Sequence, residues 1–210
     1  MDTEHRQEHW QRAYQAKTEQ EVSWYQDSPE PSLALVTAAA ASLASPVIDI
    51  GGGTSHLVDH LVQRGFRNVA VLDVSSAALA KAQARFGASA SAVDWIVADI
   101  TAWTPTRLYE VWHDRATFHF MVTEGDRSAY LARLKQALAP GGYAIIATFA
   151  LDGPEKCSGL PVMRYDSAGL ADKLGPEFML VSSQRHLHHT PWDSVQLFQF
   201  SVFKRQSGEA

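Results

Sequence analysis

A glycine-rich turn between two apolar runs constrains the fold of this chain more than any other feature. Residues 46–55 read PVIDIGGGTS, and residues 71–75 read VLDVS. An apolar run, a glycine turn, a helical pattern and a second apolar run that ends in an acid are typical of a βαβ unit. Such a turn lets backbone N–H groups approach a ligand closely, and Asp73 can accept hydrogen bonds from ribose hydroxyls. The unit therefore predicts a nucleoside-containing cofactor.

Apolar runs and helical patterns alternate beyond this unit. The apolar runs, which we predict as strands, are 47–50, 68–74, 93–100, 108–114 and 143–151. Helical patterns lie between them, and the last has Asp126 as its predicted N-cap and Pro140 at its end. A short helix at 166–175 and a predicted hairpin of two strands, 178–190 and 195–205, follow. This order is typical of an α/β protein with a largely parallel sheet.

Length, charge and cysteine content narrow the class of protein. The chain has 210 residues, a length typical of one domain. Its formal charge of −5 and its pI near 6.0 leave no basic surplus, so we expect no binding to nucleic acid or to an anionic membrane. Without an apolar segment long enough for a membrane span, we expect a soluble cytoplasmic protein. The single cysteine, Cys157, excludes an intrachain disulfide and a multi-cysteine zinc site.

Two helical segments precede the glycine turn. The first, at residues 5–17, carries Trp10 and Tyr14 four positions apart and therefore on one face. A proline-containing break follows, and Ser32 is the predicted cap of the second helix. Aromatic side chains on one helix face usually indicate packing against the rest of the protein.

This break divides the chain into two expected parts. Residues 1–31 form an N-terminal helical lid segment, and residues 32–210 form the main domain. Trp24 and Tyr25 lie in the break. Their side chains either fold over the cofactor or only pack against the domain, and the sequence leaves both readings open.

Five motifs occur in the order and spacing of one enzyme family. They are VIDIGGGTS, VLDVS, VDWIVADI, YEVWHDRATFHF and LAPGGYAIIATFA. With the closing hairpin, they resemble the class I, seven-strand methyltransferases across residues 32–205. The resemblance implies a Rossmann-like three-layer α/β/α sandwich with a seven-stranded, mostly parallel sheet whose last strand is antiparallel. It also implies methyltransferase activity with S-adenosylmethionine as the cofactor.

The resemblance assigns cofactor binding to nine residues. They are Trp24, Asp49, Gly51, Gly53, Asp73, Val74, Asp99, Ile100 and His113. In this reading Asp49 lies near the methionine part of the cofactor, Asp73 accepts from the ribose hydroxyls, and Asp99 accepts from the adenine amino group. A strand-end acid such as Asp73 can instead cap the next helix together with Ser75. Asp99 can likewise be a solvated turn residue.

The segment at the end of the fourth predicted strand supplies the candidate catalytic residues. It reads HDRATFHF over residues 113–120 and resembles the Asp-Lys-Gly-Thr-Phe-Asp segment of the seven-strand protein-lysine methyltransferase branch. The matching residues are Asp114, Thr117 and Phe118, and the departures are Arg115, Ala116 and His119. Methyl transfer needs a base only when the acceptor arrives protonated. We expect Asp114 to orient an amine or accept a proton, with His119 as the second candidate.

The identity of the methyl acceptor stays open at this point. The resemblance favours an amine, including a protein lysine, whereas the short connections also suit a small-molecule amine, thiol or hydroxyl. The chain has no Asn-Pro-Pro-Tyr segment after the fourth strand, which argues against nucleic-acid and amide acceptors. It has no obvious carboxylate trio, so we expect no catalytic metal. The loop around Cys157 is a candidate wall of the acceptor pocket.

Two other functions are weighed against this one. A nicotinamide-dependent oxidoreductase would need a third glycine near position 56, where His56 stands. A non-catalytic S-adenosylmethionine-binding regulatory protein would keep the cofactor residues without turnover. The oligomeric state is not predictable from these motifs.

Two groups of histidines are weaker candidates for a functional site. His186, His188 and His189 lie on a predicted strand and are either a solvated edge or metal ligands. His56 and His60 share one face of a predicted helix, where solvent exposure is the simpler reading. We expect neither cluster to hold a metal.

Overall fold

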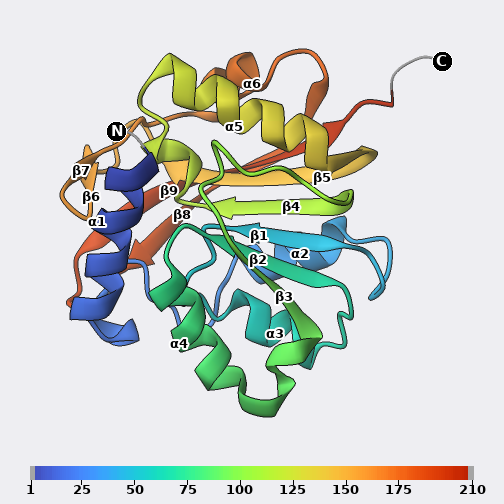
Figure 1. Cartoon of the computed structure of the whole chain (residues 1–210). Coiled ribbons are helices and arrows are strands. Elements are labelled where there is room, and N and C mark those ends of the chain that lie inside the picture. Colours follow the sequence, from blue (N-terminus) through green and yellow to red (C-terminus); the bar gives the residue numbers. More distant parts are fainter. Residues whose placement is uncertain (1–2, 208–210) are drawn as a thin grey trace.

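Seven strands form one sheet within residues 3–207, the part of the chain that the computed structural model describes (Figure 1). They are β1 (Val47–Ile50), β2 (Val69–Asp73), β3 (Val93–Val97), β4 (Tyr109–Arg115), β5 (Leu138–Phe149), β8 (Phe178–His189) and β9 (Val195–Arg205). Their spatial order is β3-β2-β1-β4-β5-β9-β8. The first five strands are parallel, and β9 is antiparallel to both of its neighbours. The predicted Rossmann-like sandwich with an antiparallel last strand is therefore confirmed.

Helices and short connections complete the described fold. The α-helices are α1 (Thr3–Ala16), α2 (Ser32–Ala39), α3 (Leu57–Gln63), α4 (Ser76–Phe86), α5 (Glu124–Ala137) and α6 (Ser167–Leu174). The 3-10 turns are η1 (Glu19–Glu21), η2 (Gly87–Ala92) and η3 (Phe118–Phe120). A small two-stranded sheet of β6 (Lys156–Cys157) and β7 (Leu160–Pro161) lies beside α1 in Figure 1.

The sheet has a hydrophobic core on each face. On one face, side chains that include Ile48 and Ile146 cluster with residues of α5 and α6. On the other face, side chains that include Val47 and Val111 cluster with residues of α2, α3 and α4. Because neighbouring strand residues point to opposite faces, the continuous apolar runs of β1 and β2 serve both cores. These two cores make the three layers of the fold.

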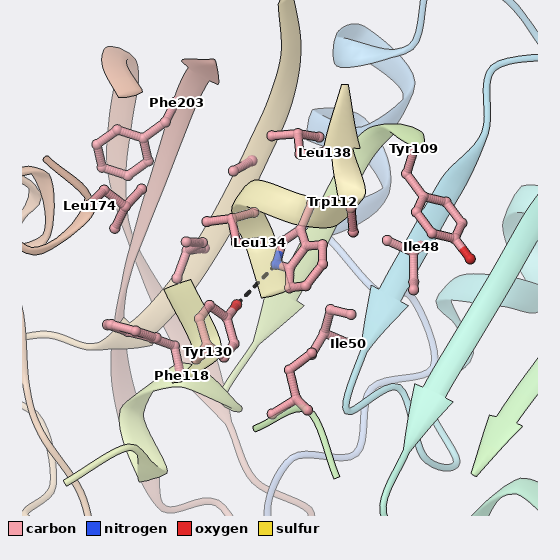
Figure 2. Close-up of a cluster of buried hydrophobic side chains, with 14 of the residues drawn as sticks. Ile48, Ile50, Tyr109, Trp112, Phe118, Tyr130, Leu134, Leu138, Leu174 and Phe203 are labelled. Carbon is pink, nitrogen blue, oxygen red and sulfur yellow. Dashed lines mark hydrogen bonds between the residues drawn. The ribbon is translucent and has the colours of Figure 1, made fainter. Parts of the chain in front are cut away.

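A buried tryptophan joins β4 to α5 (Figure 2). Trp112 is fully buried, and its indole Nε1 donates to the Tyr130 hydroxyl at 2.9 Å. The Phe118 ring packs edge-on to Tyr130 at a centroid distance of 4.8 Å. A buried indole N–H needs such a partner, since an unpaired one costs about 1–3 kcal/mol. The contact also brings Tyr130 to the carboxyl end of β4, where the functional residues begin.

Some predicted element boundaries were wrong. α5 begins at Glu124, and its N-cap is Thr123, whose hydroxyl accepts from the Asp126 N–H at 3.1 Å. Ser32 is the first residue of α2 and not its cap, because its hydroxyl hydrogen-bonds to His113 instead. The predicted loop after β5 contains the strands β6 and β7.

Candidate active site

One pocket crosses the carboxyl ends of the strands. Its lining from the ends of β1, β2 and β3 comprises Gly51, Leu72, Asp73, Val74, Ala98, Asp99 and Ile100. Its remaining lining comprises Arg6, Trp10, Tyr14, Trp24, Arg115, Ala116, Thr117, Phe120, Met121, Phe149, Cys157, Gln196 and Phe198. Since β3 and β9 lie on opposite sides of β1 and β4, the pocket extends across the centre of the sheet. Open α/β sheets place their ligands at this switch point.

The glycine turn needs its glycines for conformation and for space. Gly51 and Gly53 have φ angles of 66° and 50°, in the left-handed region that favours glycine. A Cβ on Gly51 would lie 1.9 Å from the Thr117 hydroxyl oxygen, and one on Gly53 would lie 2.4 Å from the Tyr14 hydroxyl oxygen. The turn is therefore enclosed between the end of β4 and the N-terminal helix α1.

Asp49 and His113 form a buried hydrogen-bonded pair behind this turn. The Asp49 Oδ1 lies 2.6 Å from His113 Nδ1, and His113 Nε2 lies 2.8 Å from the Ser32 hydroxyl. All three side chains are buried, and none lines the pocket. The Asp49 Oδ2 has no hydrogen-bond partner among the residues that the structure describes. An acid with one free buried oxygen beneath a glycine turn suits a ligand N–H or a water molecule.

Asp73 ends β2 and lines the pocket. Its Oδ1 accepts from the Ser75 N–H at 2.8 Å, while the Ser75 hydroxyl caps α4 by accepting from the Ala78 N–H. Ser75 is therefore the cap of α4, and Asp73 lines the pocket; ribose binding by Asp73 stays a prediction. Burial is the main cause that raises the pKa of Asp73 to about 7. Val74, the next residue, also lines the pocket.

Asp99 follows β3 and is held by the N-terminal helix. Its carboxylate accepts from Arg6 Nη1 at 2.8 and 2.7 Å and from the Thr101 N–H at 2.9 Å. Arg6 also donates from Nη2 to Asp126 at 2.9 Å, so it joins α1 to both β3 and α5. Asp99 is 6% exposed and Arg6 is 7% exposed. The predicted adenine site is thus covered by a buried ion pair, beside Ile100.

Asp114, the first catalytic candidate, fixes the turn after β4. Its carboxylate accepts from the Thr117 N–H at 2.8 Å, from the Phe118 N–H at 3.0 Å and from the Tyr130 hydroxyl at 2.5 Å. The side chain is fully buried and does not line the pocket. Burial raises its pKa to about 7. These contacts suit a positioning residue for η3, and the catalytic assignment stays a prediction.

His119, the second candidate, lies inside the protein. Its ring packs 4.9 Å from the Phe149 ring and 4.4 Å from the Phe120 ring, measured between centroids. Neither ring nitrogen has a hydrogen-bond partner among the described residues, and the side chain does not line the pocket. Burial lowers its pKa to about 3, so the imidazole is neutral near pH 7. Its role as a base stays a prediction.

Aromatic rings line the part of the pocket nearest to β9. We call Trp10, Trp24, Phe120, Phe149 and Phe198 the aromatic chamber. The Trp10 ring lies 5.8 Å from Trp24 and 5.1 Å from Phe120, and Phe149 lies 4.9 Å from Phe198. These residues come from α1, the break before α2, η3, β5 and β9. An apolar chamber of this kind excludes water and holds planar or apolar ligands.

Two polar groups face this chamber. Arg115, at the end of β4, donates from Nη1 and Nη2 to the Trp24 backbone oxygen, at 3.0 Å each. Cys157, on β6, is buried, and burial raises its pKa to about 11. The thiol is therefore neutral near pH 7 and is a weak nucleophile there. From the sequence, the loop around Cys157 was a candidate wall of the acceptor pocket. In the structure, Cys157 lines the pocket.

Sequence reasoning missed several lining residues. Arg6, Trp10 and Tyr14 lie at intervals of four on α1, so one helix face supplies all three to the pocket. The spacing of four between Trp10 and Tyr14 was visible in the sequence, and the same spacing continues back to Arg6. Phe149 and Phe198 gave no such signal, because residues distant in sequence pair only once β9 joins the sheet.

The histidine clusters have structural contacts. His188 Nε2 lies 2.6 Å from the Ser23 backbone oxygen, and the His186 ring packs against Phe200. His56 lies 3.3 Å from Glu19. Within residues 3–207, no group of three or more His, Cys, Asp or Glu side chains could hold a metal ion. The same residues contain no helix long and apolar enough to cross a membrane.

Comparison with known proteins agrees with this architecture. Residues 47–142 match the family model described as a methyltransferase domain. No curated protein matches the chain. A solved structure from work on the conversion of a disulfide bond into a thioacetal group during echinomycin biosynthesis has a TM-score of 0.76 at 20% identity, covering 98% of this chain and 94% of that chain.

Two further structures have the same fold. The 1,6-didemethyltoxoflavin-N1-methyltransferase of Burkholderia thailandensis, bound to 1,6-didemethyltoxoflavin and S-adenosylhomocysteine, has a TM-score of 0.66 at 20% identity, covering 85% of this chain and 78% of that chain. The N-methyltransferase NodS of Bradyrhizobium japonicum WM9, in complex with S-adenosylhomocysteine, has a TM-score of 0.70 at 13% identity, covering 94% and 98%. The family match thus covers the chain from β1 to the beginning of β5, and the seven-stranded sheet has the fold of these methyltransferase structures.

Proposed function

We propose that this protein transfers the methyl group of S-adenosylmethionine to a small-molecule acceptor held in the aromatic chamber. The observation that carries the proposal is a single pocket lined by Asp73 and Asp99 at one side and by the aromatic chamber at the other. S-adenosylmethionine supplies an electrophilic methyl group on a sulfonium sulfur. The acceptor must approach that carbon in line, within an enclosed and largely dry space.

The residues at the β1 and β2 ends suit the cofactor. The free buried oxygen of Asp49 can accept from an N–H group or a water molecule near the glycine turn. Asp73 receives hydrogen bonds from backbone N–H groups, and the pocket-facing part of its carboxylate suits ribose hydroxyls. Asp99, Val74 and Ile100 border the place where an adenine ring would lie. Binding by these residues is the proposal, and His113 supports it through Asp49.

The N-terminal segment completes the proposed pocket. Trp10, Tyr14 and Trp24 lie in residues 1–31, and each lines the pocket wall. The Tyr14 hydroxyl packs on the glycine turn, so the segment covers the cofactor side as well as the chamber. We therefore assign residues 1–31 the role of a lid over a main domain of residues 32–210. An acceptor enters when this lid moves.

A small acceptor suits this enclosure better than a protein side chain. The chamber is walled by α1, the segment around Trp24, β6 and β9, so a lysine on a folded protein would have to pass between them. Among the similar structures, one is described with bound 1,6-didemethyltoxoflavin, and two structures of one enzyme, MtfA, are described as those of a glycopeptide N-methyltransferase. Those acceptors are small molecules or glycopeptides. They support a small acceptor without defining its chemistry.

A two-stage experiment tests the proposal. Calorimetry first measures binding of S-adenosylhomocysteine and of NADH, and we expect micromolar affinity for the former and none for the latter. Release of S-adenosylhomocysteine is then measured with small amines, thiols, phenols and carboxylic acids, and with lysine-containing proteins. Turnover with a small molecule supports the proposal. Binding without turnover of any acceptor would indicate a non-catalytic binding protein, and turnover only with proteins would contradict the small-molecule assignment.

A further inference from the structure

Arg115 is a cation in the pocket wall without a carboxylate partner in the described residues. Its two terminal nitrogens share one acceptor, the Trp24 backbone oxygen, and its Cζ lies 5.2 Å from the centre of the Phe198 ring. No carboxylate oxygen within residues 3–207 lies within 4.0 Å of its guanidinium nitrogens. Arg6 and Arg85, in contrast, each bind carboxylates directly. A pocket-facing cation without a counter-charge favours an anionic ligand.

The charge on Arg115 persists under physiological conditions. Burial lowers its pKa to about 10, while the nearby Asp49 acts in the opposite direction. The guanidinium is therefore positive near pH 7. It has five N–H donors in a planar fork, and this geometry matches the two oxygens of a carboxylate. One backbone oxygen uses only part of that capacity.

The charge of the cofactor strengthens the preference. At neutral pH S-adenosylmethionine carries a sulfonium, an ammonium and a carboxylate group, so its net charge is positive like that of Arg115. A protonated amine beside Arg115 would add a further positive charge in a space walled mainly by aromatic rings, where charges are weakly screened. An anion would instead neutralise Arg115. The surroundings of Arg115 therefore favour an acidic acceptor over a cationic one.

We propose that Arg115 binds the carboxylate of a small aromatic methyl acceptor whose ring lies among Trp10, Trp24 and Phe198. This inference rests on the proposed small-molecule activity and defines its substrate class. Arg115 acts as a binding and specificity residue, because it holds the acceptor by its carboxylate and not by the atom that receives the methyl group. The aromatic rings supply the apolar contacts, and Arg115 fixes the orientation.

Three probes of similar size test this assignment on the full-length protein saturated with S-adenosylhomocysteine. They are phenylacetate, phenylacetamide and phenethylamine, which are anionic, neutral and cationic at pH 7. Titrations followed by saturation-transfer NMR measure their dissociation constants. We expect phenylacetate to bind at least about tenfold more tightly than phenylacetamide, with phenethylamine the weakest.

Variants locate the preference at Arg115. Arg115→Met should reduce the preference for phenylacetate to less than about threefold, while Arg115→Lys should retain part of it because the charge remains. Arg133→Met is the matched control, since Arg133 lies on α5 outside the pocket lining and its loss changes the net charge equally. Binding of S-adenosylhomocysteine verifies that each variant is folded. If Arg115→Met does not fold, the ratio of phenylacetate to phenylacetamide binding in the wild type and in Arg115→Lys still tests the role of Arg115.

Separate outcomes distinguish the two proposals. Equal binding of phenylacetate and phenylacetamide, a preference that survives in Arg115→Met, or no binding of phenylacetate up to about 10 mM would each overturn the role of Arg115. In those cases binding of S-adenosylhomocysteine persists, and the methyltransferase proposal stands. Failure of the wild-type protein to bind S-adenosylhomocysteine would overturn the proposed function and this inference together.

Discussion

The Arg6 guanidinium donates to both carboxylate oxygens of Asp99, through Nη1, at 2.8 and 2.7 Å. This buried pair joins the N-terminal helix to the end of β3, at the place proposed for adenine. Breaking a buried pair by removing one partner typically costs about 3–5 kcal/mol, because the other charge stays buried. The pair therefore contributes to holding α1, part of the proposed lid, on the domain.

Loss of Arg6 should loosen α1. Arg6→Gln is expected to raise amide hydrogen exchange across Thr3–Ala16 by at least about tenfold and to speed dissociation of S-adenosylhomocysteine, since opening of the lid becomes less costly. Exchange mass spectrometry and stopped-flow fluorescence measure these rates. Arg12→Gln is the control, because Arg12 lies on the same helix and bonds only to the Glu8 backbone oxygen among the described residues. If hydrogen exchange across α1 were unchanged in Arg6→Gln, the Arg6–Asp99 ion pair would not be what holds this helix on the domain.

Cofactor affinity should depend on pH through Asp73. Its pKa of about 7 in the free protein means that the carboxyl group is largely protonated below pH 7, and a protonated group accepts poorly from two ribose hydroxyls. The dissociation constant of S-adenosylhomocysteine should therefore rise about tenfold per pH unit below about pH 7 and be constant above it. Calorimetry from about pH 5 to pH 8 measures this dependence.

A variant separates Asp73 from other groups that titrate in this range. Asp114 also has a pKa raised to about 7, so its protonation could contribute to the wild-type profile. Asp73→Asn should bind weakly at every pH and lose the steep dependence. A variant profile as steep as that of the wild type would assign the titration to another residue.

Asp114→Asn tests whether this acid positions η3 or takes part in chemistry. The amide can no longer accept from all three donors, so we expect a loss of stability of about 1–3 kcal/mol and slower turnover. Affinity for S-adenosylhomocysteine should change by less than about threefold, since Asp114 does not line the pocket. Tyr130→Phe removes one of the same hydrogen bonds, together with the acceptor of the Trp112 N–H, and leaves the carboxyl group in place. Comparable losses of turnover in both variants indicate positioning, whereas a loss confined to Asp114→Asn indicates catalysis.

His119 should make the fold sensitive to acid. Its pKa is about 3 in the folded protein and about 6.5 when unfolded, so below pH 6.5 the unfolded state binds the proton more readily. The contribution of a neutral His119 is complete above pH 6.5 and is lost progressively as the pH falls toward 3. His119→Phe should flatten stability over this range, as measured by urea denaturation. Retained turnover in His119→Phe would remove it from the mechanism.

Several residues of the pocket side that we propose for the cofactor could be placed from the sequence, because their signals are local. The glycine turn and Asp73 lie within one βαβ unit, and each residue is close in sequence to the element that positions it. Thr123, in contrast, was overlooked as the N-cap of α5 because Asp126 is an equally good capping residue. The choice depends on where the preceding turn places the chain, and η3 sets that position.

The acceptor half could not be predicted in the same way. Its walls combine residues from both ends of the chain, and no local pattern in the sequence states that Trp10 and Phe198 will meet. Arg115 was noted only as a departure from a motif. Its chemical meaning depends on the absence of a nearby carboxylate among the described residues, which is a property of the three-dimensional arrangement.

The insertion of β9 between β5 and β8 has a consequence for biosynthesis. Phe198 on β9 pairs with Phe149 on β5, while another wall of the pocket is built from α1, which is translated before β9. The nucleoside residues can assemble early, yet the space for the acceptor is completed only after β9 has been translated. In a nascent chain, the residues that we propose for the cofactor are therefore all translated before the β9 wall of the proposed acceptor space.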